Sequence, residues 1–263
     1  MKPLAQMPRT RIATVFTDID DTLTTDGKLS AQAYEALEEL QRAGMRVIPV
    51  TGRPAGWCDQ IARLWPVDGI IGENGALYMW HDAGTGKLRT RHLLDEESRA
   101  GNAARLVEVR RRILQEVPAC AVASDQFCRQ YDLAIDFCED VPSLPHEAVE
   151  RIVRIMEESG MTAKISSIHV NGWFGDYDKL SMARLMMRER YGLDLADGAE
   201  RLRCVFAGDS PNDAPMFAYF PLSVGVANVK SFSGRLAHEP RFITARPFGA
   251  GFAELVRHLL TRH

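Results

Sequence analysis

Three aspartates directly follow an apolar segment near the start of the chain. Asp18, Asp20 and Asp21 come after residues 12–16, whose composition is typical of a buried strand. Carboxylates that lie a few ångströms apart cannot all stay ionised without a proton or a cation. Oxygen ligands suit a hard cation such as Mg²⁺. The aspartates therefore indicate a cation site, and the alternative is a polar turn, in which Asp is also common.

Further polar residues stand at the ends of predicted strands or at the start of a helix. Thr51 and Asp209 each follow an apolar segment, Lys179 follows the predicted helix cap Asp178, and Asp213 comes soon after Asp209. Each has a structural alternative as a turn, cap or solvated residue, although a cation is disfavoured at a helix N-terminus. The carboxyl ends of parallel strands meet at one edge of a sheet, where ligands bind. Together these residues indicate one phosphate site at that edge.

The elements that must position these residues alternate between strands and helices. Strands are predicted at 12–16, 46–50 and 69–71 from short apolar segments. Helices are predicted after Ser30, which suits an N-cap, and around Pro54, which suits the first helical position. This β-α-β-α-β order is typical of a parallel sheet that is covered by helices.

The pattern changes near residue 82, where glycine-rich turns begin. Helices at 103–116 and 146–159, with strands within 122–137 and 162–170, predict an inserted α+β unit. The alternating pattern then resumes with a helix at 178–190, strands at 203–207, 222–226 and 241–244, and a closing helix at 251–260. The glycines near the two junctions are predicted to serve as hinges, and they are Gly84, Gly86, Gly172 and Gly175.

The composition limits the classes of function. A chain of 263 residues forms one large domain or two of moderate size, and a net charge of −3 gives no basic field to attract nucleic acid or an anionic membrane. The basic run at 110–112 lies in a helical pattern and is predicted to be a solvated helix face. Five cysteines without a CxxC pair favour a reducing compartment, so a cytoplasmic protein is expected. Neither a signal peptide nor a membrane span is predicted.

The motifs resemble those of the haloacid dehalogenase (HAD) superfamily phosphatases of class IIB, the Cof-like group. They are, in order, the DxDxT string at 18–22, Thr51, Lys179 and the GDxxND string at 208–213. The strings at 73–76 and 224–228 are also similar to that group. Asp21 departs from it, because glycine is more common at this position.

The resemblance implies an α/β fold with a Rossmann-like doubly wound parallel-sheet core and an inserted α+β cap of the C2 type. The core would comprise residues 1–82 and 173–263, and the cap, which sets substrate specificity, residues 83–172. The cap would close over the site as a lid.

The resemblance also implies a Mg²⁺-dependent phosphatase that hydrolyses a small phosphorylated metabolite, such as a sugar phosphate or a related monoester, through an aspartyl-phosphate. Asp18 would be the nucleophile and Asp20 the general acid and base. The dehalogenases of this superfamily lack the second aspartate. Asp18, Asp209 and the backbone carbonyl of Asp20 would hold the Mg²⁺ ion. Thr51 and Lys179 would take part in catalysis by binding the phosphoryl group.

Other residues would support this site. Asn212 and Asp213 would order the surroundings of the metal and of Lys179. Substrate contacts are expected from Thr51, Gly52, Arg53, Asn74, Lys179 and His169, and Asn171 and Trp173 are further candidates. The expected partner is a small phosphorylated metabolite rather than a nucleic acid or a membrane, and the protein is expected to be a monomer or a homodimer.

Two other functions stay open at this point. One is a phosphomutase of the phosphomannomutase type, which has the same class of cap and returns the phosphoryl group to a sugar. The other is a non-catalytic Mg²⁺-dependent regulatory or binding protein. The presence of all the motif residues argues against the second alternative, and release of free phosphate would argue against the first.

Overall fold

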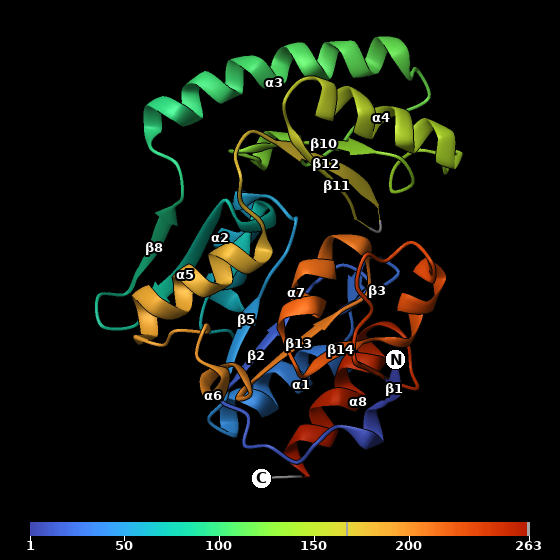
Figure 1. Cartoon of the computed structure of the whole chain (residues 1–263). Coiled ribbons are helices and arrows are strands. Elements are labelled where there is room, and N and C mark those ends of the chain that lie inside the picture. Colours follow the sequence, from blue (N-terminus) through green and yellow to red (C-terminus); the bar gives the residue numbers. More distant parts are fainter. Residues whose placement is uncertain (167, 262–263) are drawn as a thin grey trace.

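The computed structural model describes residues 1–166 and 168–261, and it has a cap above a larger core (Figure 1). The core contains a six-stranded sheet with all neighbouring strands parallel, in the order β1-β15-β14-β13-β2-β5. The predicted fold class, a doubly wound parallel sheet with an inserted α+β unit, is confirmed. The strands of the sheet are β1 (Lys2–Pro3), β2 (Thr14–Thr17), β5 (Arg46–Pro49), β13 (Cys204–Gly208), β14 (Ser223–Gly225) and β15 (Phe242–Ile243).

Helices cover both faces of this sheet. Successive residues of a strand point to opposite faces, so Val15 of β2 joins one buried apolar cluster and Phe16 the other. A parallel sheet that is covered on both faces needs apolar residues on both, which explains the continuous apolar segments of the sequence. The first face is covered by α1 (Ala31–Arg42), α2 (Ala55–Leu64) and α8 (Phe248–Leu260), and the second by α5 (Lys179–Tyr191) and α7 (Ala214–Tyr219).

The strand predicted at 69–71 forms, but it belongs mainly to another sheet. That antiparallel sheet consists of β6 (Ile70–Gly72), β7 (Leu77–Asp82) and β8 (Lys87–His92). A single parallel bridge between Val50 and Ile71 joins it to β5. Val50 donates its N–H to Thr17 of β2, so the neighbouring Pro49 faces β6. Proline has no N–H to donate, which interrupts the pairing of β5 with β6.

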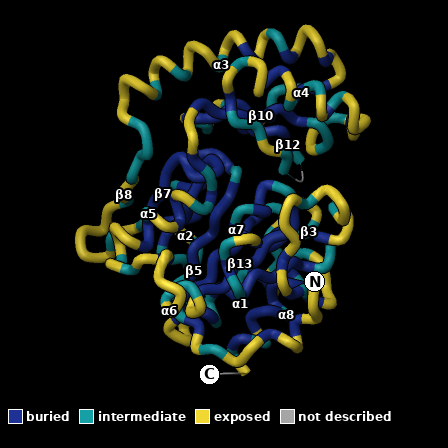
Figure 2. Tube along the Cα trace, viewed as in Figure 1, coloured by how far each residue is buried: buried dark blue, intermediate teal, exposed yellow. Residues whose placement is uncertain are grey.

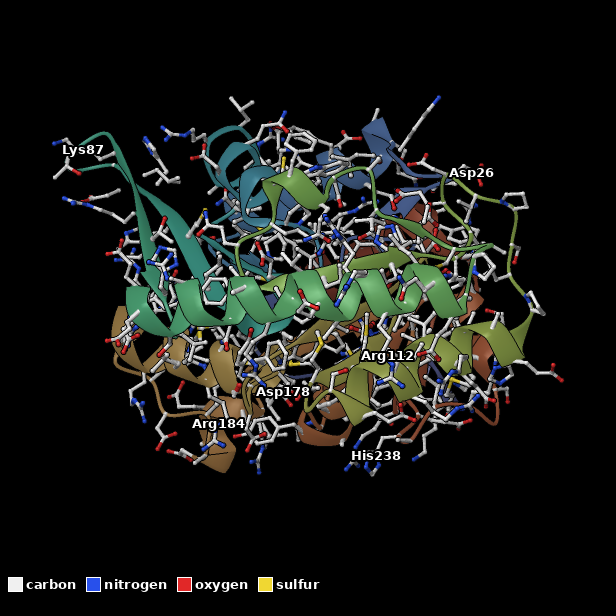
Figure 3. The ribbon with its side chains drawn as sticks, turned by 90° about the horizontal axis from the view of Figure 1, so that it is seen from above. Asp26, Lys87, Arg112, Asp178, Arg184 and His238 are labelled. Carbon is white, nitrogen blue, oxygen red and sulfur yellow. The ribbon has the colours of Figure 1, made fainter. Side chains whose placement is uncertain are left out.

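The β7–β8 hairpin extends past the predicted junction at residue 82. Its turn contains Gly84 and Gly86, and Lys87 lies at its far tip (Figure 3). The prediction that these two glycines are hinges is therefore wrong. Gly172 is not a hinge either, because it lies within a paired strand where a Cβ atom would come within 2.5 Å of Met156 Sδ. Gly175, with φ +133°, does lie in the connection that returns to the core.

The cap consists of a four-stranded antiparallel sheet and two helices. The order of the sheet is β11-β12-β10-β9, with β9 (Ala121–Val122), β10 (Asp132–Asp136), β11 (Thr162–Ile165) and β12 (His169–Trp173). The helices α3 (Glu96–Glu116) and α4 (His146–Glu158) cover the side of the sheet away from the core (Figure 1). α3 begins earlier than predicted because Asp95 caps it and accepts the N–H of Ser98 at 2.8 Å. The domain boundaries predicted at 82–83 and 172–173 stay a prediction.

The outer side of α3 is largely exposed (Figure 2). Arg110 and Arg111 point to solvent, and Arg112 forms an ion pair with Glu158 of the adjacent α4 (Figure 3). This arrangement agrees with the predicted solvated helix face. Among the described residues, no helix combines the length and the apolar character that a membrane span requires.

Candidate active site

A buried lysine joins the end of β2 to the loop after β13. Lys179 begins α5, and its Nζ lies 2.7 Å from Asp18 Oδ1 and 2.7 Å from Asp213 Oδ1. All three side chains are buried. A cation at a helix N-terminus is otherwise unfavourable. Here two carboxylates compensate for that position, so the site rather than the helix explains the lysine.

Asp209 is fixed by contacts on both of its carboxylate oxygens. Thr22 donates to Oδ1 at 3.1 Å, and Asn228 donates to Oδ2 at 3.2 Å. Asn228 is anchored in turn, because its Oδ1 accepts the N–H of Phe248 at 2.9 Å. The role of Asn228 was not predicted, although it ends the 224–228 string that resembles the HAD group. These bonds place Asp209 at the end of β13, opposite Asp18.

The acidic side chains fit a bound cation. One carboxylate oxygen each from Asp18, Asp209 and Asp213 lies within 4.8 Å of the others. Burial raises the pKa of Asp18 to about 8, opposed by Lys179 and assisted by Asp213 and Asp20. Burial and the charge of Asp18 also raise the pKa of Asp209 well above its ordinary value. A divalent ion would relieve this cost.

Asp213 is the least available ligand of the three. Its Oδ1 accepts from Lys179, and its Oδ2 accepts the backbone N–H groups of Asp209 and Ser210 at 3.0 and 3.3 Å. Asp18 and Asp209 are therefore the better pair of metal ligands. Asn212, also buried, accepts from the hydroxyl of Ser210 at 2.8 Å. Asn212 and Asp213 thus stabilise the loop that carries Asp209.

Arg53 connects the predicted acid and base to the cap. Its Nε lies 2.9 and 3.1 Å from the two carboxylate oxygens of Asp20. Its Nη1 donates to Asp125 at 3.3 Å, and its Nη2 donates to Glu139 at 2.9 Å, and both acceptors belong to the cap. The guanidinium also lies 4.4 Å from the centre of the Trp57 ring. One core side chain thus contacts the predicted general acid, Asp20, and two cap carboxylates at once.

Two further contacts hold the cap against the core. Arg129 of the cap donates to the carbonyl of Gly52 at 2.8 Å and forms ion pairs with Asp125 and Asp132. Glu73 of the core is fully buried, and its carboxylate accepts the backbone N–H groups at 130, 131 and 132 of the cap. Both contacts come from one cap segment, residues 129–132, and join it to the core. The structure is therefore in a closed state.

Between the two domains lies a cavity of about 10 Å³. It brings together the predicted site residues Asp18, Asp20, Gly52, Arg53, His169 and Asn212, together with Asn171 and the unpredicted Arg129. Thr51 lies beneath it, fully buried, and its Oγ1 accepts the N–H of Arg53 at 3.0 Å. Trp173 does not line the cavity but stacks on Tyr177 at 5.6 Å.

Asn74 is a predicted substrate contact with an unusual environment. It is buried, yet neither its Oδ1 nor its Nδ2 has a hydrogen-bond partner among the described residues. Its φ of 55° lies in the left-handed region. Buried polar groups are nearly always paired in native proteins. The unpaired amide lies against Gly52 of the cavity wall, which supports a ligand-binding role.

His169 is placed by a carboxylate of the cap. Its Nε2 lies 2.8 Å from Oε2 of Glu139, whose other oxygen binds Arg53. These neighbours lower the pKa of Glu139 to about 2, His169 having the largest effect. Glu139 is consequently ionised at neutral pH and bridges His169 and Arg53.

Comparison with known proteins agrees with this geometry. A sequence profile described as haloacid dehalogenase-like hydrolase matches residues 15–101. A phosphoglycolate phosphatase from Pyrobaculum neutrophilum is 29% identical over 247 residues, which cover 93% of this chain and 94% of that protein. The chain is thus similar to the haloacid dehalogenase-like hydrolases, through the profile over residues 15–101 and through a relative along most of its length.

Solved structures share its fold. A Thermoplasma acidophilum protein has a TM-score of 0.70 and 18% identity, and the alignment covers 95% of this chain and 99% of that one. A HAD subclass IIB sugar phosphatase has a TM-score of 0.63 and 13% identity, with 95% and 100% covered. The resemblance to class IIB phosphatases that the motifs predicted is confirmed.

Sequence reasoning missed most of the residues that join the cap to the core. Asp125, Arg129 and Glu139 lie in cap segments without a motif, and nothing in their local sequence indicates a contact with Arg53 or Gly52. Trp57 carried a usable signal, since it follows Arg53 by four residues where a helix begins.

Proposed function

We propose that this HAD hydrolase is a Mg²⁺-dependent phosphatase that acts on a small phosphorylated metabolite through an aspartyl-phosphate intermediate. Its class as a phosphatase is supported by the relative from Pyrobaculum neutrophilum, which is named a phosphoglycolate phosphatase. A second similar protein is described as a sugar phosphatase. The substrate class therefore comprises sugar phosphates and short phosphorylated acids. A cytoplasmic location is part of the proposal, supported by the odd number of cysteines.

The observation that carries the proposal is the pairing of Asp18 with Lys179, with Asp18 and Asp20 both lining the cavity between the cap and the core. Asp18 would attack phosphorus, so that a bond from its carboxylate to phosphorus forms as the bond to the alcohol oxygen breaks. Lys179 lies close enough to Asp18 to bind a phosphoryl oxygen at that position. Thr51, at the end of the neighbouring β5, would bind another. These charges and dipoles are fixed before the reaction, which is the most effective form of electrostatic stabilisation.

Asp20 would act as general acid and then as general base. It would give a proton to the departing alcohol and later take one from the water that attacks the intermediate. In the structure its carboxylate contacts Arg53 and lines the cavity, whereas Asp18 contacts Lys179. The two aspartates thus have different partners, which supports different roles for them.

The donor set fits a hard divalent cation. Asp18 and Asp209 would hold Mg²⁺, joined by the backbone carbonyl of Asp20. When bound, the ion would supply positive charge that offsets the negative charges of the carboxylates and the phosphate. The observation that supports this fit is the convergence of buried carboxylate oxygens from Asp18 and Asp209 within 4.8 Å, and burial also raises the pKa of both groups.

A phosphate-release screen tests the proposal. The purified protein is incubated with Mg²⁺ and a panel that includes phosphoglycolate, sugar phosphates, polyol phosphates and nucleotides. We expect release of phosphate from at least one small ester and no turnover by Asp18→Asn. Asp26→Asn is a matched control, because Asp26 is exposed and lies at the edge of the molecule (Figure 3).

Two results would contradict the proposal. Turnover by Asp18→Asn at the rate of the wild type would exclude Asp18 as the nucleophile. Conversion of one sugar phosphate into another without free phosphate would identify a phosphomutase instead.

A further inference from the structure

We infer that Arg53 and Glu139 form a latch that closes the cap so tightly that water is the only acceptor of the phosphoryl group. The inference rests on the proposed function, because it concerns the fate of the aspartyl-phosphate. It makes Glu139 a positioning residue that decides between hydrolysis and transfer to an alcohol.

The latch joins the core cation Arg53 to the cap anion Glu139, and a second cap anion, Asp125, contacts the same cation. The Arg53 guanidinium is almost completely buried, and it contacts Asp125 at 3.3 Å and Glu139 at 2.9 Å. Charge-assisted hydrogen bonds of this kind are among the stronger ones in proteins. When the cap opens, Arg53 must leave both cap carboxylates and be hydrated again. The cap therefore docks on the core through contacts with this cation and not through apolar contacts alone.

Glu139 is held in place before it meets Arg53. The carboxylate of Asp136 accepts the N–H groups of Cys138, Glu139 and Asp140 at 2.9, 2.7 and 2.7 Å. This turn fixes the backbone around Glu139, and His169 lies 2.8 Å from its second carboxylate oxygen. A preorganised partner loses little conformational freedom on docking. The cap thus presents Glu139 to Arg53 as a rigid unit.

The closed cavity limits what can attack the intermediate. Its volume of about 10 Å³ is near the least that holds one water molecule. The latch must give way to admit the substrate and to release the alcohol, and it can form again once the alcohol has left. An acceptor with a carbon chain exceeds this volume and therefore requires the cap to open.

The chemistry of the second step shows why this restriction matters. The oxygen of water forms a bond to phosphorus, the bond from phosphorus to the Asp18 carboxylate breaks, and Asp20 takes the proton. If an alcohol attacked instead, the same bonds would form and break and a new phosphate ester would result. Arg53 contacts Oδ1 of Asp20 through two nitrogens and Oδ2 through one, which leaves Oδ2 with a further lone pair for the acceptor. The latch therefore orients the base and excludes the alcohol at once.

The test measures how the phosphoryl group is divided between water and glycerol. Each protein hydrolyses 4-nitrophenyl phosphate with Mg²⁺ and a high concentration of glycerol, and 4-nitrophenol and free phosphate are counted separately. For the wild type we expect equal amounts. For Glu139→Gln we expect nitrophenol to exceed free phosphate by about ten times the smallest difference that the assay resolves. Glu139→Asp, which keeps the charge on a shorter side chain, should fall in between.

Glu150→Gln is the matched control, because Glu150 is an exposed carboxylate of α4 that faces away from the cavity. It should leave the ratio at the value of the wild type. Folding of each variant is checked by circular dichroism and by its melting temperature. An unchanged ratio in both Glu139 variants would overturn the latch and leave the phosphatase proposal intact. If the wild type released neither nitrophenol nor phosphate, the proposed function would fail, and the latch with it.

Discussion

Lys179→Met would test the network at the centre of the site most directly. The substitution replaces a buried ammonium by an apolar chain of similar length and leaves Asp18 and Asp213 without their shared partner. Removing one partner of a buried ion pair costs about 3–5 kcal/mol. Burial already raises the pKa of Asp18 to about 8, so this carboxyl can take a proton in place of the lysine. We therefore expect the lower end of the range, about 3 kcal/mol.

Urea denaturation of the metal-free protein measures this cost. With a slope of about 1–3 kcal/mol per molar urea, a loss of about 3 kcal/mol lowers the midpoint by about 1–3 M. Lys164→Met is the matched control, since Lys164 is exposed on β11 and should change the stability by less than about 0.5 kcal/mol. After Mg²⁺ is added to the same preparation, phosphate release should fall about 10²–10³-fold, as expected when one fixed charge-stabilising group is lost.

A double-mutant cycle supplies the result that would refute this reasoning. Lys179 and Asp213 contact each other, so Lys179→Met combined with Asp213→Asn should cost clearly less than the two separate losses added together. Additive losses would show that the two side chains do not form the pair. A loss below about 1 kcal/mol in Lys179→Met, with phosphate release retained, would likewise contradict a buried network that depends on this lysine.

The remaining predictions concern the metal and the general acid. The raised pKa of Asp18, about 8 against an ordinary 3.8, stabilises the metal-free fold at low pH, and this contribution is lost as the pH rises toward 8. Mg²⁺ should therefore raise the melting temperature more at pH 8 than at pH 6 in a fluorescence melt. Equal increases at the two pH values would show that the ionisation of Asp18 is not coupled to binding of Mg²⁺. Asp20→Asn should slow hydrolysis of alkyl phosphates about 10²–10⁴-fold, yet give a burst of nitrophenol from 4-nitrophenyl phosphate, whose leaving group needs no proton. Rapid-quench kinetics would detect the burst. If Asp20→Asn slowed nitrophenol release in the first turnover as much as it slows hydrolysis of alkyl phosphates, Asp20 would be excluded as the acid.

Much of the core could be predicted because its signals are local. Ser30 accepts the N–H of Ala33 as an N-cap does, and Gly192 ends α5 in a left-handed conformation. The apolar segments at 12–16 and 203–207 lie side by side in the sheet as β2 and β13. Because the site residues follow such segments, their meeting at one edge also follows from the topology of a parallel sheet.

The contacts between cap and core could not be predicted in this way. Arg53 and Glu139 are separated by 86 positions, and their meeting depends on how two domains dock. No periodicity of either segment carries that information. The β7–β8 hairpin was missed for a different reason. β8 is mostly polar, and β7, although it begins with apolar residues, follows a turn of irregular backbone at 73–75. Local patterns thus predict elements, whereas docking depends on surfaces that form only after folding.

Asp21, the third aspartate of the motif at 18–22, matters for its backbone conformation and not for its carboxylate. Asp21 has a φ of 55°, in the region that favours glycine and that Asp and Asn tolerate better than most residues. An aspartate in place of the glycine that is usual in the family can therefore adopt the same loop conformation. Its backbone carbonyl accepts from Asn228 at 2.9 Å, and the same amide group donates to Asp209. Asp21 thus orders a predicted metal ligand through its main chain, and the demand on this position is for a conformation and not for a carboxylate.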